Sequence, residues 1–305
     1  MADISRSEVA SLIAEEYGPE TIKSAIEGST ALAAFPTVNM GTKTRNLPVL
    51  ATLPEAAWVG ESATEASGVK PTSKATWANK TLVAEEVAVI VPVHENVLDD
   101  ATEDVLANLA KLGGQALGLK LDQAVLFGID KPTSWTSPAL LSAAVTAGNA
   151  FTVTPGAANG SDLFGVIAQA AGAVAEDGFS PDTLLSSLAL RWRMANLRDA
   201  NGNLAFRDES FAGFSTFFNR NGAWASTSAE ALVVDSSRVR IGVRQDVTVK
   251  FLDQATLGTG EDQINLAERD MVALRFVARF AYVLASGATS VGPNKFPVGA
   301  ALPAA

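Results

Sequence analysis

The stretch VPVHENVLDDATEDVLANLAKLGGQALGLKLDQAVLFG, residues 91–128, joins the end of an expected strand to a long expected helix. HENVL is typical of a short helical turn, and Asp100 with Glu103 has the spacing of a capping box. Apolar residues then recur every three or four positions, which predicts an amphipathic helix over about residues 101–127. Gly128 is expected to end this helix.

Three glycines lie inside this helix, at Gly113, Gly114 and Gly118. Each costs a helix about 1 kcal/mol relative to alanine. We therefore expect them to mark a kink or a close crossing of another backbone.

The stretch also holds the only histidine of the chain, His94, followed by Glu95. A zinc-protease helix needs H-E-x-x-H, and HENVL lacks the second histidine. A serine hydrolase needs G-x-S-x-G, and GFSTF at residues 213–217 lacks the second glycine. We therefore interpret His94 as a polar residue at a helix start, and residues 91–100 as a structural junction.

Two other candidate motifs also lack residues that their function requires. DANGNLAFRDES, residues 199–210, looks like a calcium loop, but its sixth and twelfth positions hold Leu204 and Ser210 rather than Gly and Glu. The glycines at 258–260 and 287–299 lack the Lys-Ser/Thr ending of a phosphate-binding loop. Without cysteine, disulfides and thiolate metal sites are excluded. The sequence predicts no catalytic, cofactor-binding or metal-binding residues, and no cofactor.

The length, composition and net charge of the chain disfavour some classes of protein. The chain has 305 residues, of which 48% are hydrophobic and 18% charged, and its net charge is −10. That acidity disfavours a surface built to grip nucleic acid. The N-terminus lacks the features of a signal peptide, and no stretch reaches the about 20 apolar residues of a membrane span. We expect a soluble protein.

Residues 46–93 have the period-two pattern of strands, in the runs RNLPVLATLPEAAWVGE (45–61) and ATWANKTLVAEEVAVIVPV (75–93). Between them lies a polar linker with Gly68 and Pro71. The two runs predict a long two-stranded ribbon with an exposed tip. Such a ribbon is marginal alone in water and needs a surface to lie on. One face of the second run carries Trp77, Asn79, Thr81, Val83, Glu85, Val87, Val89 and Val91.

Residues 1–45 are interpreted as an arm rather than a core element, because their apolar residues are sparse. Residues 3–27 favour a helical segment interrupted at Gly18-Pro19. Its apolar positions are Ile4, Val9, Leu12, Ile13, Ile22 and Ile26.

The C-terminal half is expected to mix helices and strands. Residues 129–160 are expected to be loop-rich. Ser161 and Asp162 can cap a helix that runs to about Glu176 and stops at Gly178. A short strand (183–188) and a helix (188–198) follow, and then strands over 229–236, 238–252 and 270–285. With no chemical site and two extended elements that need a partner, the sequence favours assembly over catalysis.

The order of these elements resembles the major capsid proteins of tailed double-stranded-DNA bacteriophages, which have the Hong Kong 97-like fold. The ribbon is similar to the extended loop of that family, and residues 93–128 to its turn into a long spine helix. DMVALRFVARFAYVLASGATSV, residues 270–291, resembles its closing strand. The resemblance spans about residues 46–292.

The resemblance implies an α+β fold divided in four. Residues 1–45 would form the N-terminal arm and 46–86 the extended loop. Residues 87–145 and 256–282 would form the peripheral domain, with the spine helix at about 101–127. Residues 146–255 and 283–305 would form the axial domain and C-terminal tail.

The implied function is a non-enzymatic major capsid protein that assembles as pentamers and hexamers into an icosahedral phage head enclosing double-stranded DNA. The implied location is the virion capsid, assembled in the bacterial cytoplasm of the host. Implied partners are further copies of the chain, a separate scaffolding protein, a portal protein and possible decoration proteins, with neither a membrane nor sequence-specific DNA binding. The expected contacts between subunits are Trp58, Glu61, Glu65, Lys70, Lys74 and Trp77.

Some relatives are cross-linked by Lys–Asn isopeptide bonds assisted by a glutamate. The ribbon offers Lys70, Lys74 and Lys80, but the Asn and Glu places hold Asp270 and Val277. We expect no cross-link. Two alternatives stay open: a shell protein of a cellular nanocompartment with the same fold, and a soluble α/β enzyme or ligand-binding protein.

Overall fold

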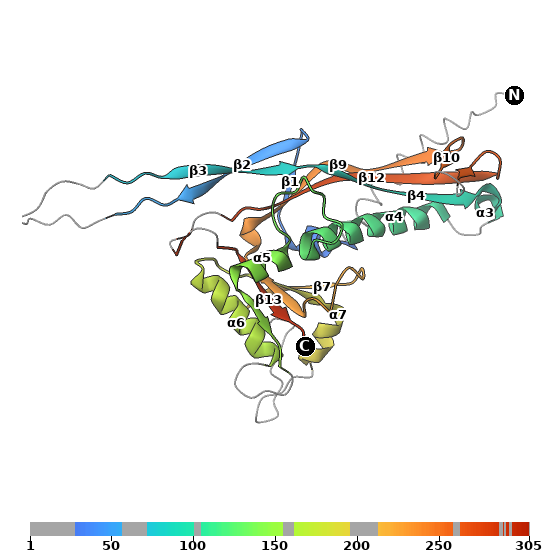
Figure 1. The fold of residues 1–305 in the computed structure, drawn as a ribbon. Coiled ribbons are helices and arrows are strands. Elements are labelled where there is room, and N and C mark those ends of the chain that lie inside the picture. Colours follow the sequence, from blue (N-terminus) through green and yellow to red (C-terminus); the bar gives the residue numbers. More distant parts are fainter. Residues whose placement is uncertain are drawn as a thin grey trace, which may run out of the picture.

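The computed structural model describes residues 28–56, 72–100, 105–154, 162–195, 213–258, 263–286, 289, 291–292 and 295–304. Two sheets form two parts of the body, and a two-stranded ribbon projects from it (Figure 1). The expected arm helix over 3–27, the ribbon tip, Glu103 of the expected capping box and the loop at 199–210 lie outside the described residues, whereas Asp100 is the last residue of helix α3 (Glu95–Asp100).

A four-stranded sheet forms the first part, in the order β1-β9-β12-β4. Its strands are β1 (Thr37–Asn39), β4 (Glu85–His94), β9 (Val239–Leu252) and β12 (Met271–Leu284). Strand β12 pairs antiparallel with both β9 and β4, and the short β1 adds parallel to β9. The expected strand over 270–285 is therefore confirmed as an inner strand of this sheet. A small hairpin of β10 (Thr256–Leu257) and β11 (Ile264–Asn265) follows β9.

The junction in residues 91–100 has the expected form. Strand β4 ends at His94, and α3 (Glu95–Asp100) begins at the next residue. Helix α4 (Val105–Asp122) then runs along the sheet and continues as one π-helical segment, η1 (Gln123–Phe127) (Figure 1). Gly128, with φ of +75°, caps it as predicted.

One of the three helix glycines has a clear role. A Cβ on Gly113 would lie 2.7 Å from Cδ2 of Phe276, on β12. Carbon atoms in contact are normally about 3.5–4.0 Å apart. Gly113 thus marks a close contact, but its neighbour is the aromatic ring of Phe276 and not the backbone that the sequence analysis expected.

A five-stranded sheet forms the second part, in the order β5-β13-β8-β6-β7. Its strands are β5 (Ala150–Thr152), β6 (Thr183–Ser187), β7 (Ser215–Asn219), β8 (Ala231–Val234) and β13 (Val298–Leu302). The three middle strands are almost wholly buried. The short helix η2 (Ser236–Arg238) leads from β8 into β9, and so from this sheet to the other.

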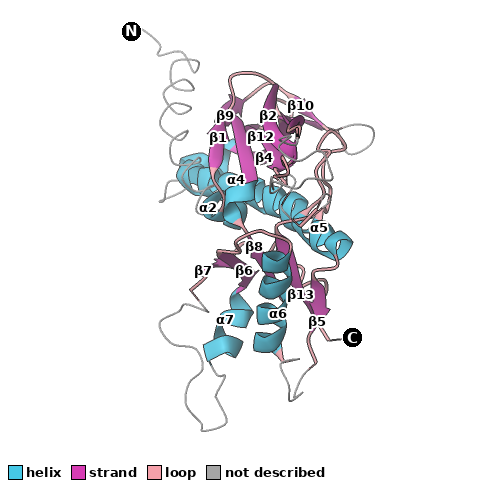
Figure 2. Cartoon of the chain, turned by 90° about the vertical axis from the view of Figure 1, so that its left-hand side faces the viewer, coloured by secondary structure: helices cyan, strands magenta, loops and turns pink. Residues whose placement is uncertain are grey.

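Three helices accompany this sheet: α5 (Leu140–Ala147), α6 (Leu163–Glu176) and α7 (Leu188–Ala195) (Figure 2). Asp162 caps α6 as predicted, since its carboxylate accepts a 2.9 Å hydrogen bond from the Gly165 amide. Helix α6 lies close on β13, because a Cβ on Gly299 would stand 2.7 Å from the Ala170 carbonyl oxygen. None of the described helices is long and apolar enough to cross a membrane.

One sequence prediction was wrong about the segment before the ribbon. Residues 29–40 are not only an arm: helix α2 (Thr30–Ala34) buries Ala31 and Leu32 in the core, and β1 joins the sheet. A few apolar residues suffice because Ala31, Leu32, Phe35 and Met40 are buried. The described part of residues 129–160 is loop-rich as expected, with the short elements α5 and β5 inside it.

Two boundaries also differ. Strand β9 lies in the four-stranded sheet with β12, whereas the sequence division placed residues 239–252 with the axial domain. The apolar alternation of a strand does not say which sheet it joins. The expected strand over 75–93 divides at Ala84, two residues before the expected end of the extended loop.

Candidate inter-subunit surfaces

The ribbon consists of β2 (Thr44–Thr52) and β3 (Thr76–Val83), paired antiparallel with a register shift near its outer end. Polar contacts hold its outer half. The hydroxyls of Thr52 and Thr76 are hydrogen-bonded. The pairing persists beyond the strands, where the Glu55 amide donates to the Ser73 hydroxyl at 2.8 Å. The ribbon extends well beyond the body (Figure 1).

The root of the ribbon is apolar and fixed to the four-stranded sheet. Leu82 and Ala84 are buried with Met40, Ala281 and Val283. The indole Nε1 of Trp135 donates to the Val83 carbonyl at 2.9 Å, exactly where β3 ends. At this point the chain changes its pairing partner, from β2 along β3 to β12 along β4. Because the root is anchored to the four-stranded sheet, the exposed part of the ribbon leaves the body in a defined direction.

The outer part of the ribbon carries exposed apolar side chains. Trp77 is 69% exposed and Leu53 is 37% exposed. Of the predicted contact residues, Trp77 and Lys74 are described, and both side chains are exposed near the outer end. Trp58, Glu61, Glu65 and Lys70 lie in 57–71, outside the described residues.

The two positions considered for the cross-linking Asn and Glu both lie in or next to β12. Asp270 lies in the turn before β12, with φ of +48°, and its carbonyl accepts from the amide of Glu95. Val277 is 9% exposed in the middle of β12. His94 pairs with Met271 at the same end of the sheet and is exposed.

A second surface, which the sequence did not reveal, surrounds the buried carboxylate of Asp122 at the end of α4. This carboxylate accepts hydrogen bonds from two segments that are distant in the sequence. Ser29 Oγ donates to it at 2.7 Å, and the amides of Thr30 and Ala31 donate at 2.9 Å. Two side-chain amides at the end of β7 donate as well, from Asn219, its last residue, at 3.1 Å and from Asn221 at 2.7 Å.

The electrostatics of Asp122 follow from this burial. Desolvation raises the pKa of its carboxyl, and the hydrogen bonds from Ala31, Ser29, Thr30 and Asn221 lower the pKa and offset part of that rise. One side chain thus ties the start of α2, the end of α4 and the end of β7 together. A sequence signal was present: Asp122 follows Gly114 and Gly118 at helical spacing, on the face where small residues allow close approach.

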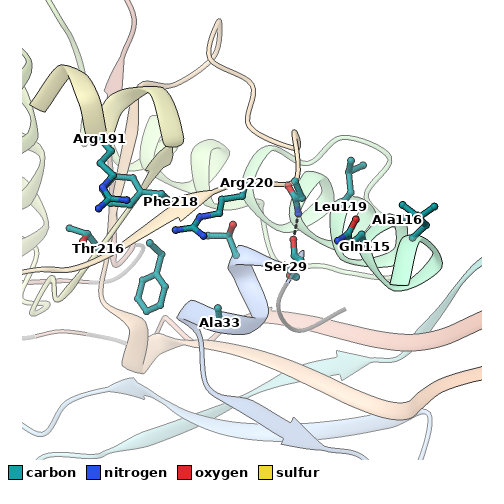
Figure 3. Close-up of a pocket in the computed structure, with 14 residues that line it drawn as sticks. Ser29, Ala33, Gln115, Ala116, Leu119, Arg191, Thr216, Phe218 and Arg220 are labelled. Atoms are coloured by element: carbon teal, nitrogen blue, oxygen red, sulfur yellow. Dashed lines mark hydrogen bonds between the residues drawn. The ribbon is translucent and has the colours of Figure 1, made fainter. Parts of the chain in front are cut away.

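Beside Asp122 lies an open groove of about 1020 Å³ between α2, α4, α7 and β7 (Figure 3). Its walls carry apolar side chains from α4 and β7, and the guanidinium groups of Arg191 and Arg220. On the outside of α7, Trp192 is 68% exposed beneath the Arg191 guanidinium, which lies 5.7 Å from its ring centre. Within the described ranges, no cluster of His, Asp or Glu could hold a metal ion.

The chain matches the model of the phage capsid family over residues 10–289. It belongs to the phage capsid family. A solved structure from Mycobacterium phage Bobi is 69% identical over 100% of both chains, with a TM-score of 0.83. One from Mycobacterium phage Cain is 68% identical over 99% of both chains, with a TM-score of 0.84.

More distant structures share the fold. A structure from Microbacterium phage Oxtober96 is 40% identical over 90% of this chain and 91% of its own, with a TM-score of 0.79. A comparison with curated proteins gave no match. The phage capsid family is structural, so this chain is a structural component of a virion capsid and not an enzyme. Its α+β fold is Hong Kong 97-like, and such chains build icosahedral shells of many copies.

Proposed function

We propose that the chain assembles as pentamers and hexamers into the head that encloses the double-stranded DNA of a phage. The observation that carries this proposal is the ribbon. Its root is buried in the body, while most of its outer side chains are exposed. A two-stranded ribbon is marginal in water. A neighbouring subunit in a closed shell supplies the surface that the ribbon needs.

The residues that make this contact are Trp77 and Lys74, together with Trp58, Glu61, Glu65 and Lys70 nearer the tip. Their contributions differ in size. A tryptophan can bury about 150–250 Å², and each Å² of apolar surface is worth about 25 cal/mol. An exposed ion pair is worth about 0–1 kcal/mol. Burial of the tryptophans therefore outweighs the charge pairs in this contact.

The domain assignment follows the two sheets. The four-stranded sheet with α4 forms the peripheral domain, and the five-stranded sheet with α5, α6 and α7 forms the axial domain near the symmetry axes. This assignment moves β9 into the peripheral domain, because β9 pairs along its length with β12.

The partners of the assembling chain are further copies of itself, a separate scaffolding protein and a portal protein. The outer surface of the shell is also open to decoration proteins. Assembly takes place in the bacterial cytoplasm of the host. The DNA is enclosed without sequence-specific binding, which fits a net charge of −10.

The shell is held without isopeptide bonds, because Asp270 and Val277 occupy the places of the required Asn and Glu. On a denaturing gel, mature particles should run as a single chain. A ladder of oligomers that resists denaturation would show that Lys70, Lys74 or Lys80 has reacted after all.

The decisive experiment is electron microscopy and light scattering of the chain expressed alone and with its scaffolding gene. Closed shells, or free pentamers and hexamers, support the proposal. A monomer or dimer that persists with the scaffold present would overturn it. The variant Trp77→Ala should lower shell yield, whereas Val145→Ala, at a 55% exposed position on α5, is the matched control.

A further inference from the structure

The chain enters the described body at a fixed point on the wall of the groove. The Gly28 carbonyl accepts a hydrogen bond from the Asn221 side chain, and the next three residues are tied to Asp122. A Cβ on Gly28 would lie 3.3 Å from Cα of Gln115. The backbone at Gly28 is therefore already in contact with the spine helix when the arm departs from it.

The groove beside this point has an apolar floor and a basic side. Leu112 is 59% exposed, and it shares one face of α4 with Ala116 and Leu119. Figure 3 shows Gln115, Ala116 and Leu119 on one side of the groove, and Arg191 and Arg220 on the other. The only acidic residue between 105 and 122 is the buried Asp122. This surface is therefore basic in a chain whose net charge is −10.

The segment that precedes Gly28 has the complementary composition. Residues 1–27 carry six acidic residues and two basic ones, Arg6 and Lys23, which gives a net charge of −4. The acidic residues are Asp3, Glu8, Glu15, Glu16, Glu20 and Glu27. Ile22 and Ile26 are spaced four apart just before Gly28. The segment thus offers apolar side chains for the floor of the groove and carboxylates for its basic side.

We propose that the groove between α2, α4, α7 and β7 is the docking site for residues 1–27 of the same chain. Ile22 and Ile26 cover the apolar stripe at Leu112, and the arm's carboxylates pair with Arg191 and Arg220. Attachment at Gly28 makes the arm's own groove the favoured one, because a short linker gives an effective concentration of about millimolar. This docking is independent of the shell symmetry proposed above.

The chain has no native cysteine, so in a cysteine cross-linking experiment every thiol is an introduced one. The double variant Ile22→Cys/Leu112→Cys is treated with a short bismaleimide, and the denatured chains are separated on a gel. Six residues can span about 20 Å when extended, so connectivity alone does not force this pair together. The control pair is Ile22→Cys/Lys120→Cys, which uses an exposed position of the same helix outside the groove.

We expect a cross-linked, faster-running monomer for the groove pair, with at least five times the yield of the control pair. Adding Arg220→Glu should lower that yield severalfold, and Arg220→Lys should preserve it. Equal yields for the two pairs would overturn the proposal. So would a cross-linked dimer, which would place the arm of a second copy in the groove, or a yield that Arg220→Glu leaves unchanged. Because the gel reads denatured chains, these outcomes do not depend on whether shells form.

Discussion

Replacing Gly113 by alanine tests the close packing of the spine helix on the sheet. The new Cβ would stand 2.7 and 2.8 Å from three ring atoms of Phe276, about 1 Å inside normal contact. Phe276 is 0% exposed, so its ring has no solvent-filled space to enter.

Two effects oppose each other in this variant. Alanine favours a helix over glycine by about 1 kcal/mol. Overpacking a filled core costs about 1–3 kcal/mol. We expect the second effect to dominate, so Gly113→Ala should lower the free energy of unfolding by up to about 2 kcal/mol.

The matched control is Gly172→Ala in helix α6. That glycine is exposed, and a Cβ there would meet nothing within 4 Å. Its substitution should therefore stabilise the chain by about 0.5–1 kcal/mol. The two substitutions are chemically identical, and their effects should have opposite signs.

Urea denaturation of unassembled subunits measures both variants, with equal slopes expected because the exposed surface is unchanged. A third variant, Gly113→Ala/Phe276→Leu, removes the ring and should recover part of the loss, which a double-mutant cycle quantifies. If Gly113→Ala stabilised the chain as much as Gly172→Ala, the packing argument would be refuted.

Three further predictions concern other contacts. Asp122→Asn places a side-chain amide against five hydrogen-bond donors, so it should lower the free energy of unfolding, measured in urea, by about 1–3 kcal/mol. The control is Asp130→Asn, at an exposed ion pair, which should change that free energy by less than about 1 kcal/mol. Gly299→Ala should lower the free energy of unfolding by about 1–3 kcal/mol, because the backbone carbonyl of Ala170 cannot rotate away. Soluble yield and the urea midpoint measure this loss of stability. Trp77→Ala should leave subunit stability within about 0.5 kcal/mol but reduce shell yield in light scattering.

Each of these has a clear contrary result. Equal stabilities of the two aspartate variants would mean that Asp122 is not the tie between three segments. A stable Gly299→Ala subunit would mean that α6 can move away from β13. Normal shell yield with Trp77→Ala would remove that side chain from the subunit contact.

Local signals account for the parts of the fold that the sequence predicted. The cap at Asp162 and the stop at Gly128 depend on neighbouring residues only, and the long strands β9 and β12 show their period over 14 residues each. The junction at His94 was predicted for the same reason. The order of these elements carried the family resemblance, which added the expected domains and function.

Contacts between distant segments were beyond local patterns. The spacing of Gly114, Gly118 and Asp122 marks one helix face, but it does not identify the partners of Asp122, which lie 91 to 99 residues away in both directions. The groove exists only because α2 and β7 meet there. Of the predicted contact residues, Trp77 was placed correctly on an exposed ribbon, because strand alternation and a polar neighbourhood are visible in sequence.

The position of β13 has a consequence for the timing of folding. This strand lies between β5 and β8, and Ala300 stands opposite Ala150, a separation of 150 residues. The five-stranded sheet therefore cannot close until residues 298–302 have been synthesised, and contacts of such long range form slowly. A nascent subunit carries an unfinished five-stranded sheet while the rest of the described chain is already made. Association surfaces built on that sheet become available only to chains translated through Leu302.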